Sequence, residues 1–232
     1  SGKRTEADLA DHLKEFDALL AKHKDEKTDD VAQILFMKAL LYLEVFDNNE
    51  KGRELIQQVK KDFPETSQGK NADKMLAGID RQEAGKKVQA QLKEGAVFPD
   101  FKENDLEGKP LSIANYKGKV VLIDFWATWC GPCVQELPNV LKAYEKYHNK
   151  GFDIIGISLD KDKAALTSFI EKRSMPWKQY FDGKGWENKL AQQYGINSIP
   201  ATYLLDGEGK IVAKDLRGDS LSQELDRLLQ NK

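Results

Sequence analysis

The fold of this chain is decided by residues 120–133, which read VVLIDFWATWCGPC. The run begins with an almost continuous series of apolar residues up to Trp126, which is typical of a buried strand. Beyond Cys133 the apolar residues recur at helical spacing, at Val134, Leu137, Val140, Leu141 and Tyr144. Cys130 and Cys133 are therefore expected where a buried strand ends and a helix begins.

Cys130 and Cys133 are the only cysteines among the 232 residues, and their position suits redox chemistry. The first turn of a helix carries unpaired backbone N–H groups and a partial positive charge, which favour a thiolate over a thiol. Because the thiolate is the nucleophilic form, we expect Cys130 to be an attacking group near neutral pH. Gly131 leaves room for a tight turn, and Pro132 suits an early helical position where its missing N–H costs no hydrogen bond.

Three interpretations of the cysteine pair compete. A structural disulfide would close so short a loop that it would remove little entropy from the unfolded chain. A zinc site needs about four Cys or His ligands, but no other cysteine exists and the three histidines lack metal-binding spacing, so we predict no metal. Reversible dithiol–disulfide exchange explains both the number and the closeness of the cysteines. We therefore favour exchange and expect no further cofactor.

The composition is that of a soluble globular protein of one or two domains, with 40% hydrophobic and 32% charged residues. A formal net charge of −2 with interspersed basic residues argues against a general nucleic-acid binder. The apolar stretches are too short or too interrupted to span a bilayer, so no transmembrane segment is expected. The chain begins at Ser1 without an initiator Met, from which we expect a signal or anchor segment to be missing.

Residues 1–92 are predicted to form a helical domain of antiparallel helices, since the apolar residues there recur three and four apart. Breaks are expected at residues 47–49 and 64–67, and the last helix is expected to continue to Leu92. Residues 36–64 match the spacing of one tetratricopeptide-type helix pair, and a plain antiparallel bundle is the alternative. The region has no paired catalytic groups, so we expect it to contact a partner or a second copy of itself.

Residues 93–232 have a different pattern, in which short strand-like runs alternate with helices. Alternation of this kind implies a layered α/β domain with the cysteines at the carboxyl end of a strand. Beyond the stretch already quoted, the predicted strands are 152–159, 201–205 and 210–213, and the predicted helices are 163–172, 186–194 and 221–229.

Residues 125–133, FWATWCGPC, resemble the thioredoxin superfamily, and the resemblance extends over about Gly95 to Lys232. The chain also contains FPDF at 98–101, YKGK at 116–119, ELP at 136–138, ISLD at 157–160 and DGKGW at 182–186. With these stretches it resembles the TlpA/ResA-type thiol-disulfide oxidoreductases. The resemblance implies a thioredoxin-like fold, with a mixed central sheet flanked by helices, and a protein-disulfide reductase that acts on protein thiols and disulfides and depends on an upstream electron donor. It also implies an extracytoplasmic location, in the periplasm or cell envelope.

The resemblance assigns roles around the cysteines. Cys130 would be the nucleophile and Cys133 the resolving thiol. Asp124 matches the buried acid of thioredoxin, which could exchange a proton with Cys133, although an aspartate at the end of a strand could also cap it or face solvent. Glu136 matches an acid that tunes the cysteines in ResA-like proteins, although an acid in a first helical turn also complements the helix dipole.

Substrate contacts follow from the same resemblance. Pro200 matches the cis-proline that lies against the cysteine pair, and Ile199 before it would offer its backbone to an extended substrate segment. Trp129 would shield the disulfide and present a surface to partners. Pro138 matches the proline that kinks the active-site helix.

The sequence thus predicts a thiol-disulfide oxidoreductase that reduces protein disulfides through Cys130 and Cys133. A disulfide oxidase or isomerase is the nearest alternative, because the same chemistry runs in either direction according to the reduction potential. A thiol peroxidase is less well supported, since Thr128 does not reproduce the arrangement of that family. A redox-sensing scaffold, whose helical domain binds a partner, is the remaining possibility.

Overall fold

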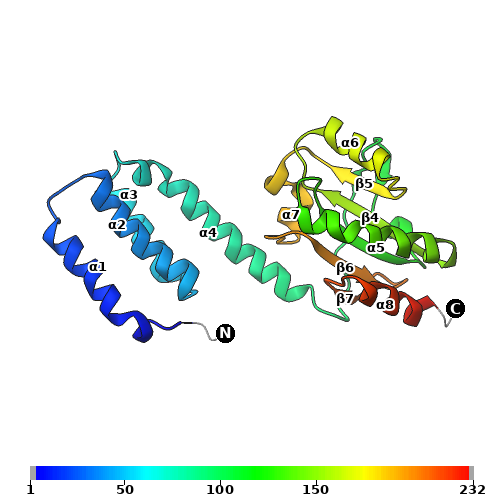
Figure 1. Cartoon of the computed structure of the whole chain (residues 1–232), viewed down its shortest axis with the longest axis horizontal. Helices are drawn as coiled ribbons and strands as arrows, with labels where there is room; N and C mark the ends of the chain where they lie inside the picture. The colour runs from blue at the N-terminus through cyan, green and yellow to red at the C-terminus, as the bar shows by residue number, and fades with distance from the viewer. Residues whose placement is uncertain (1–3, 230–232) are drawn as a thin grey trace. The chain divides into compact units, whose positions relative to one another are not determined.

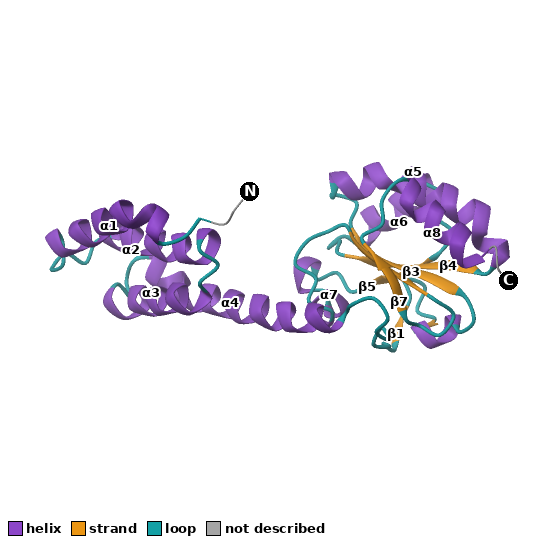
Figure 2. Ribbon diagram, turned by 90° about the horizontal axis from the view of Figure 1, so that it is seen from below, coloured by secondary structure: helices purple, strands orange, loops and turns teal. Residues whose placement is uncertain are grey.

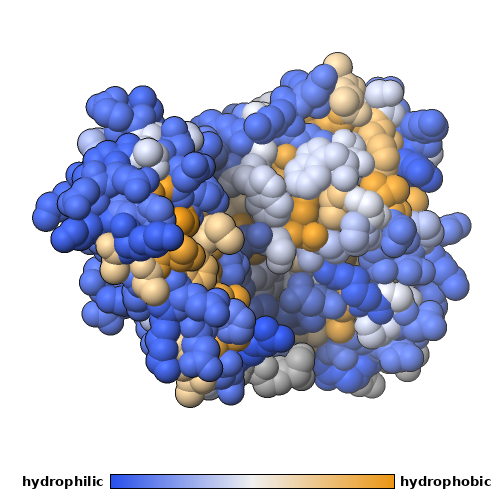
Figure 3. All heavy atoms as spheres, turned by 60° about the vertical axis from the view of Figure 1, so that its left-hand side comes forward, coloured by the Kyte–Doolittle hydropathy of each residue, from blue (hydrophilic) through white to orange (hydrophobic). Residues whose placement is uncertain are grey.

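A computed structural model describes residues 4–229 and divides the chain into two compact units, up to Glu83 and from Ala84 onward (Figure 1). We call them the helical unit and the redox unit. One helix, α4 (Ser67–Gln91), contains the boundary between them. Most of the surface visible in Figure 3 is hydrophilic, as expected from the charged composition. Among the described residues, the large exposed hydrophobic side chains are Leu19, Met37, Val97, Trp129 and Trp186.

The helical unit is built from α1 (Ala10–Lys22), α2 (Asp29–Leu40), α3 (Asn49–Asp62) and the first part of α4, with a short 3-10 helix η1 (Ala7–Leu9) and a π-helix η2 (Leu41–Val45). Side chains cap two of these helices. The Thr28 hydroxyl accepts from the Val31 N–H, and the Asn48 side chain accepts from the Lys51 N–H. Their apolar faces meet in one core made by Val31, Ala32, Leu35, Ala39, Tyr42, Leu55, Ile56, Val59, Phe63 and Ala72.

The redox unit has a central five-stranded sheet in the order β5-β4-β3-β6-β7 (Figure 2). Strands β3, β4 and β5 are parallel, while β6 runs antiparallel to β3 and β7 antiparallel to β6, so the sheet is mixed as predicted. The strands are β3 (Val120–Trp126), β4 (Phe152–Ser158), β5 (Lys178–Phe181), β6 (Ala201–Leu205) and β7 (Ile211–Lys214). A separate ribbon is made by β1 (Glu103–Asn104) and β2 (Pro110–Leu111).

Helices cover the sheet, and α5, α6 and α8 lie on one face of it in Figure 2. The placement of α5 and α6 on the same face follows from the two parallel crossovers, β3 to β4 through α5 and β4 to β5 through α6. The helices are α5 (Gly131–Tyr147), α6 (Lys163–Lys172), α7 (Lys189–Gln193) and α8 (Asp219–Leu229). This arrangement is the thioredoxin-like fold expected from the sequence.

The end of α4, from Ala84 onward, belongs to the redox unit and packs into it. Leu92 is buried in the core of that unit, and Val88 contacts it. The Gln89 side chain donates to the Tyr194 carbonyl (2.6 Å) and accepts from the Tyr203 hydroxyl (2.8 Å). The division between the units therefore lies inside α4, near residue 84, whereas the change in sequence pattern was placed at 92/93. The sequence pattern of α4 stays helical along its whole length, but its first part packs into the core of the helical unit and its end into the core of the redox unit.

Two details of the sequence-based interpretation need correction. The helix expected over 186–194 is split into the turn η5 (Gly185–Glu187) and α7, because Asn188 leaves helical geometry and its side chain caps the Ala191 N–H. Strand β5 had no counterpart among the predicted strands. Its sequence, KQYF, is polar at one end, but its Gln179 is buried and accepts a hydrogen bond from the Trp126 indole (3.0 Å).

Candidate active site

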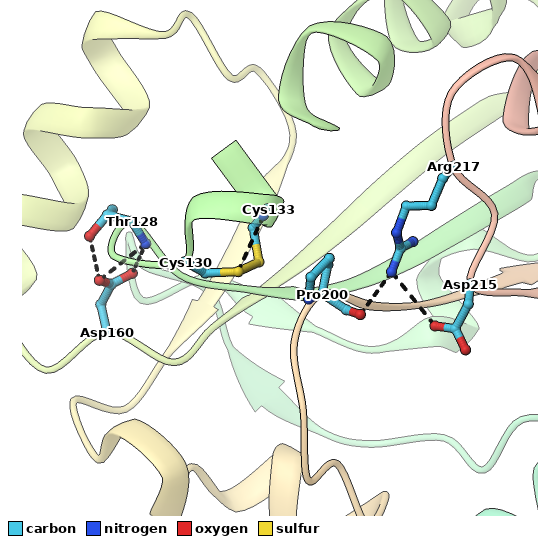
Figure 4. Close-up of a disulfide and its surroundings, with 7 residues drawn as sticks. All are labelled: Thr128, Cys130, Cys133, Asp160, Pro200, Asp215 and Arg217. Carbon is cyan, nitrogen blue, oxygen red and sulfur yellow. Dashed lines mark hydrogen bonds and ion pairs between the residues drawn. A yellow bond between two sulfur atoms is a disulfide. The ribbon is translucent and has the colours of Figure 1, made fainter. Parts of the chain in front are cut away.

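Cys130 and Cys133 form a disulfide at the junction between β3 and α5 (Figure 4). Cys130 is the N-cap of α5, and its sulfur accepts a hydrogen bond from the Cys133 N–H (3.2 Å). Both cysteines are buried, whereas Gly131 and Pro132 between them are exposed. The predicted strand-to-helix position of the pair is confirmed, and it puts the sulfur of Cys130 where unpaired N–H groups favour negative charge.

The loop that leads to Cys130 is anchored by Asp160, which is almost fully buried just beyond the end of β4. Its carboxylate accepts from the Thr128 N–H (3.1 Å) and the Thr128 hydroxyl (2.6 Å), as Figure 4 shows, and from the Ser158 hydroxyl (2.8 Å). These bonds satisfy a buried charge and hold the loop at the carboxyl end of the parallel strands.

Trp129 projects from this anchored loop. Its side chain is 54% exposed, and its ring lies 6.0 Å from that of Trp186, which is 43% exposed. Trp186 belongs to a loop that is itself fixed, since Asp182 accepts from the Lys189 N–H (2.8 Å). A groove of about 540 Å³ borders both rings. Two large aromatic surfaces thus face solvent beside the disulfide.

The Ile199–Pro200 peptide bond is cis, and β6 begins at the next residue. The Pro200 carbonyl accepts a hydrogen bond from Arg217 (2.7 Å), drawn in Figure 4. Pro200 also lines a small cavity of about 20 Å³ beneath the disulfide. The polar and reactive side chains around this cavity are Asp124, Cys133, Glu136, Thr202 and Arg217. It therefore brings together four of the residues singled out in the sequence: Asp124, Cys133, Glu136 and Pro200.

Asp124 occupies a strand position with small neighbours, because Gly156 of β4 and Thr202 of β6 lie opposite it in the sheet. Its side chain remains partly accessible, since it faces the cavity, but the surrounding protein withdraws it from bulk water. Burial raises the pKa of Asp124 to about 7, Arg217 acts to lower it and Glu136 adds to the rise. A carboxyl group with this pKa can take up or release a proton near neutral pH.

Glu136 is held on both oxygens. One accepts the Gly218 N–H (2.7 Å) and the other accepts from the Asn139 side chain (3.3 Å). The bond to Gly218 joins the active-site helix to the loop before α8, so Glu136 does more than complement the dipole of its own helix.

Three residues of this site were given no role from the sequence: Asp160 and Trp186, which were noted only as parts of stretches that resemble the family, and Arg217. A signal existed for Asp160, which follows a buried strand parallel to β3 and must end at the same edge of the sheet. The sequence offered no comparable signal for Arg217, which reaches the cavity only because the β7–α8 loop folds back over β6.

Within residues 4–229, no group of three or more His, Cys, Asp or Glu side chains could hold a metal ion. None of the helices in the described part of the chain is long and apolar enough to cross a membrane.

A thioredoxin-like sheet with a disulfide at a strand-to-helix junction defines a thiol-disulfide oxidoreductase. The family described as Redoxin matches residues 93–229, and the chain belongs to this family. The chain is 33% identical to the thiol-disulfide oxidoreductase ResA of Bacillus thuringiensis subsp. konkukian. The match extends over 136 residues, which are 59% of this chain and 76% of that protein. ResA of Bacillus cereus strain ZK is 35% identical over 136 residues, again 59% of this chain and 76% of the relative.

Solved structures agree with this assignment. The thioredoxin domain of the thiol-disulfide oxidoreductase BVU-2223 from Bacteroides vulgatus is 38% identical and has a TM-score of 0.55, covering 60% of this chain and 99% of that one. A thiol-disulfide oxidoreductase from Bacteroides fragilis is 34% identical with a TM-score of 0.53, covering 59% of this chain and all of the other. The chain is an enzyme of the thiol-disulfide oxidoreductase class.

Proposed function

We propose that this oxidoreductase works as a reductase of disulfides in protein substrates. The observation that carries the proposal is the pairing of a disulfide at the start of α5 with a buried acid, Asp124, on the cavity lined by Cys133. The oxidised pair in the structure corresponds to the enzyme after it has delivered two electrons.

In the first step the Cys130 thiolate attacks one sulfur of a substrate disulfide. A bond forms between Cys130 and that sulfur, the substrate disulfide breaks, and the other substrate sulfur leaves as a thiolate. In the second step the Cys133 thiolate attacks the Cys130 sulfur, which forms the disulfide seen here and releases the second substrate thiolate. The substrate gains two electrons and the enzyme loses two, so a thiol donor has to reduce the enzyme before the next cycle.

Asp124 is proposed to accept the Cys133 proton in the second step. Two observations support this role: both side chains line the same cavity, and burial brings the pKa of Asp124 close to neutral pH. A cavity of about 20 Å³ has room for a single water molecule, which could relay the proton. Glu136, on the same cavity, is proposed to tune Asp124 and the cysteines through its negative charge.

Substrate recognition is proposed to use the surfaces on either side of the disulfide. Ile199 would offer backbone groups to an extended substrate segment, in the manner of a strand added to a sheet edge. Trp129 would cover the apolar part of that segment, which its exposure supports. Pro200, whose carbonyl is already bonded to Arg217, would shape the loop rather than bind substrate through that oxygen.

The setting of this reaction is proposed from family resemblance. We propose an extracytoplasmic location, an upstream thiol donor as electron source, and the helical unit as the part that contacts a partner or a second copy of the chain. The exposed Leu19 and Met37 support a contact role for that unit. The tetratricopeptide-like character of its α2–α3 pair stays a prediction.

Equilibration with glutathione redox buffers tests the direction of the reaction. We expect a reduction potential near that of thioredoxin, about −270 mV, and a value above about −180 mV would instead support the oxidase or isomerase alternative. A Cys133→Ser variant should trap a mixed disulfide with its substrate through Cys130. A Cys130→Ser variant is the matched control and should trap none through this route.

A further inference from the structure

The loop between β7 and α8, residues 215–218, folds over the cavity beneath the disulfide. Asp215 and Gly218 at its two ends both have left-handed backbone conformations, with φ of 52° and 55°. Aspartate and glycine are among the residues that adopt this conformation most readily, and a pair of such residues produces a tight bend. The bend brings Leu216 and Arg217 to the cavity wall.

Arg217 bonds to the strand that carries the cis-proline. It donates to the Pro200 carbonyl (2.7 Å) and to the Thr202 hydroxyl (3.1 Å), and within its own loop to the Leu216 carbonyl (2.8 Å). The carboxylate of Asp215 lies 3.8 Å away and is largely exposed, so it offsets the charge of Arg217 only weakly. The guanidinium is therefore fixed mainly by neutral acceptors, and its positive charge remains available to the cavity.

The same loop also fixes an anion. The N–H of Gly218 donates to Glu136 at 2.7 Å, so adjacent residues of one loop position a cation and hold a carboxylate on the wall of one cavity. The titratable or charged groups that face Asp124 there come from two elements: Cys133 and Glu136 from α5, and Arg217 from the loop. The other lining residues carry no charge.

We propose that loop 215–218 sets the charge around Asp124, and that Arg217 is a positioning residue of the redox site which fixes the Pro200 carbonyl and supplies the cation facing that acid. This inference rests on the proposed function, because it gives Asp124 its role as proton acceptor. Arg217 then has two effects: it keeps the cis-proline loop in place for substrate, and it favours the ionised form of the acid that receives the Cys133 proton.

The two charges oppose one another. Burial alone raises the pKa of Asp124, Glu136 raises it further and Arg217 lowers it. Without Arg217 the acid would hold its proton to higher pH and would be a less available acceptor at neutral pH. Without the charge of Glu136 the acid would ionise at lower pH. Substitutions at these two positions should therefore move Asp124 in opposite directions.

Carboxyl ¹³C NMR of the full-length oxidised protein tests the inference without any substrate. Arg217→Gln should move the titration midpoint of Asp124 to higher pH, Arg217→Lys should move it less because the cation is retained, and Glu136→Gln should move it to lower pH. Arg173→Gln is the matched control, since Arg173 is an exposed arginine of the same unit over the Phe169 ring. An Arg217→Gln midpoint equal to that of the control, or a Glu136→Gln midpoint that stays in place, would overturn the proposal.

The pH profile of protein-disulfide reduction gives a second readout. Arg217→Gln should lose about fivefold to tenfold in kcat at pH 7 and recover towards pH 9, where the acid is again ionised. A loss that is equal at both pH values would indicate a purely structural role and overturn the tuning effect. If the wild-type protein reduced no disulfide at all, the proposed function would fail, while the NMR titration would still decide whether Arg217 sets the charge at Asp124.

Discussion

The two units of this chain use their charged residues in different ways. In the helical unit, charges tie neighbouring helices together near the surface: Arg53 of α3 pairs with Asp80 and Glu83 of α4, at 2.7 and 3.2 Å. In the redox unit, Asp124 and Asp160 lie near the carboxyl ends of two neighbouring parallel strands, on either side of the disulfide loop. Withdrawing a carboxylate from water costs free energy. Two carboxylates in this region therefore indicate that its residues serve a chemical role in addition to packing.

The two units also have separate hydrophobic cores, which share no residue. Ile56 in the helical unit and Ile155 in the redox unit are each fully buried. Separate cores imply that each unit obtains its packing energy from its own residues, although α4 joins them covalently. The comparison can be tested by damaging one core and observing the other.

The largest effect is expected from Ile155→Ala and Ile56→Ala, each of which removes buried methyl groups and leaves a cavity. Each should lower the unfolding free energy of its own unit by about 2–5 kcal/mol. Hydrogen exchange followed by NMR would locate the loss: Ile155→Ala should reduce protection in β3 and β4, and Ile56→Ala in α2 and α3. An Ile56→Ala variant that weakened the sheet as much as the helices would show that the two cores are coupled.

A smaller effect, dependent on pH, is expected from Asp124→Asn. The pKa of Asp124 is about 7 in the folded oxidised protein and about 3.9 in an unfolded chain. Between these values the folded protein binds a proton that the unfolded chain has released, so the unfolding free energy of the wild type falls as pH rises from about 4 to 7. The asparagine variant should lack this fall and be about 2–4 kcal/mol more stable than wild type at pH 8.

Urea unfolding at pH 5 and pH 8 measures this difference. Asp160→Asn is the informative control, because that carboxylate is held by three hydrogen bonds from Thr128 and Ser158 and its replacement should weaken the protein at both pH values. An Asp124→Asn variant with the same pH dependence as wild type would show that Asp124 does not titrate in this range.

Much of the redox unit could be predicted because its local signals are strong. The apolar run before Cys130 specified β3, and helical spacing after Cys133 specified α5. Helix α6 has the bounds expected, Lys163–Lys172, since Asp162 caps it through the Ala164 N–H. Strand β5 was missed because it is short and partly polar. Its buried Gln179 is explained by the hydrogen bond that it accepts from Trp126, which is distant in the sequence.

The site could be predicted only in part for the same reason. One stretch of strand and helix contains Asp124, Cys130, Cys133 and Glu136. In this stretch the spacing of the residues and the family resemblance both indicated the site. Arg217 comes from a loop whose path depends on the folded sheet, and no local pattern marks it. Trp186 ends the DGKGW stretch at 182–186, but nothing in that stretch indicated that its ring would lie near that of Trp129. The contact between Gly218 and Glu136 spans residues that nothing in the sequence brings together.

Exposed apolar side chains offer another comparison between the units, with an effect of about tenfold. Trp129→Ala should lower kcat/KM for a protein disulfide about tenfold, because exposed aromatic residues at a binding surface often contribute more than 1 kcal/mol. Met37→Ala, an equally exposed site in the helical unit, should leave that value unchanged. Reduction of glutathione disulfide should change little in either variant. Equal losses in both would place substrate contacts on the helical unit as well.

The smallest expected effect locates the boundary between the units within α4. Gly78 and Gly85 are both helical glycines on that helix, but a Cβ at Gly78 would meet open space, whereas one at Gly85 would lie 3.3 Å from the Gly195 Cα. Gly78→Ala should therefore stabilise the helical unit by up to about 1 kcal/mol through helix propensity. Gly85→Ala should lose that gain, because it presses on the backbone that leads to the cis-proline loop. Thermal unfolding of the two variants checks this, and an equal gain from both would mean that the end of α4 does not pack on the rest of the redox unit near Gly195.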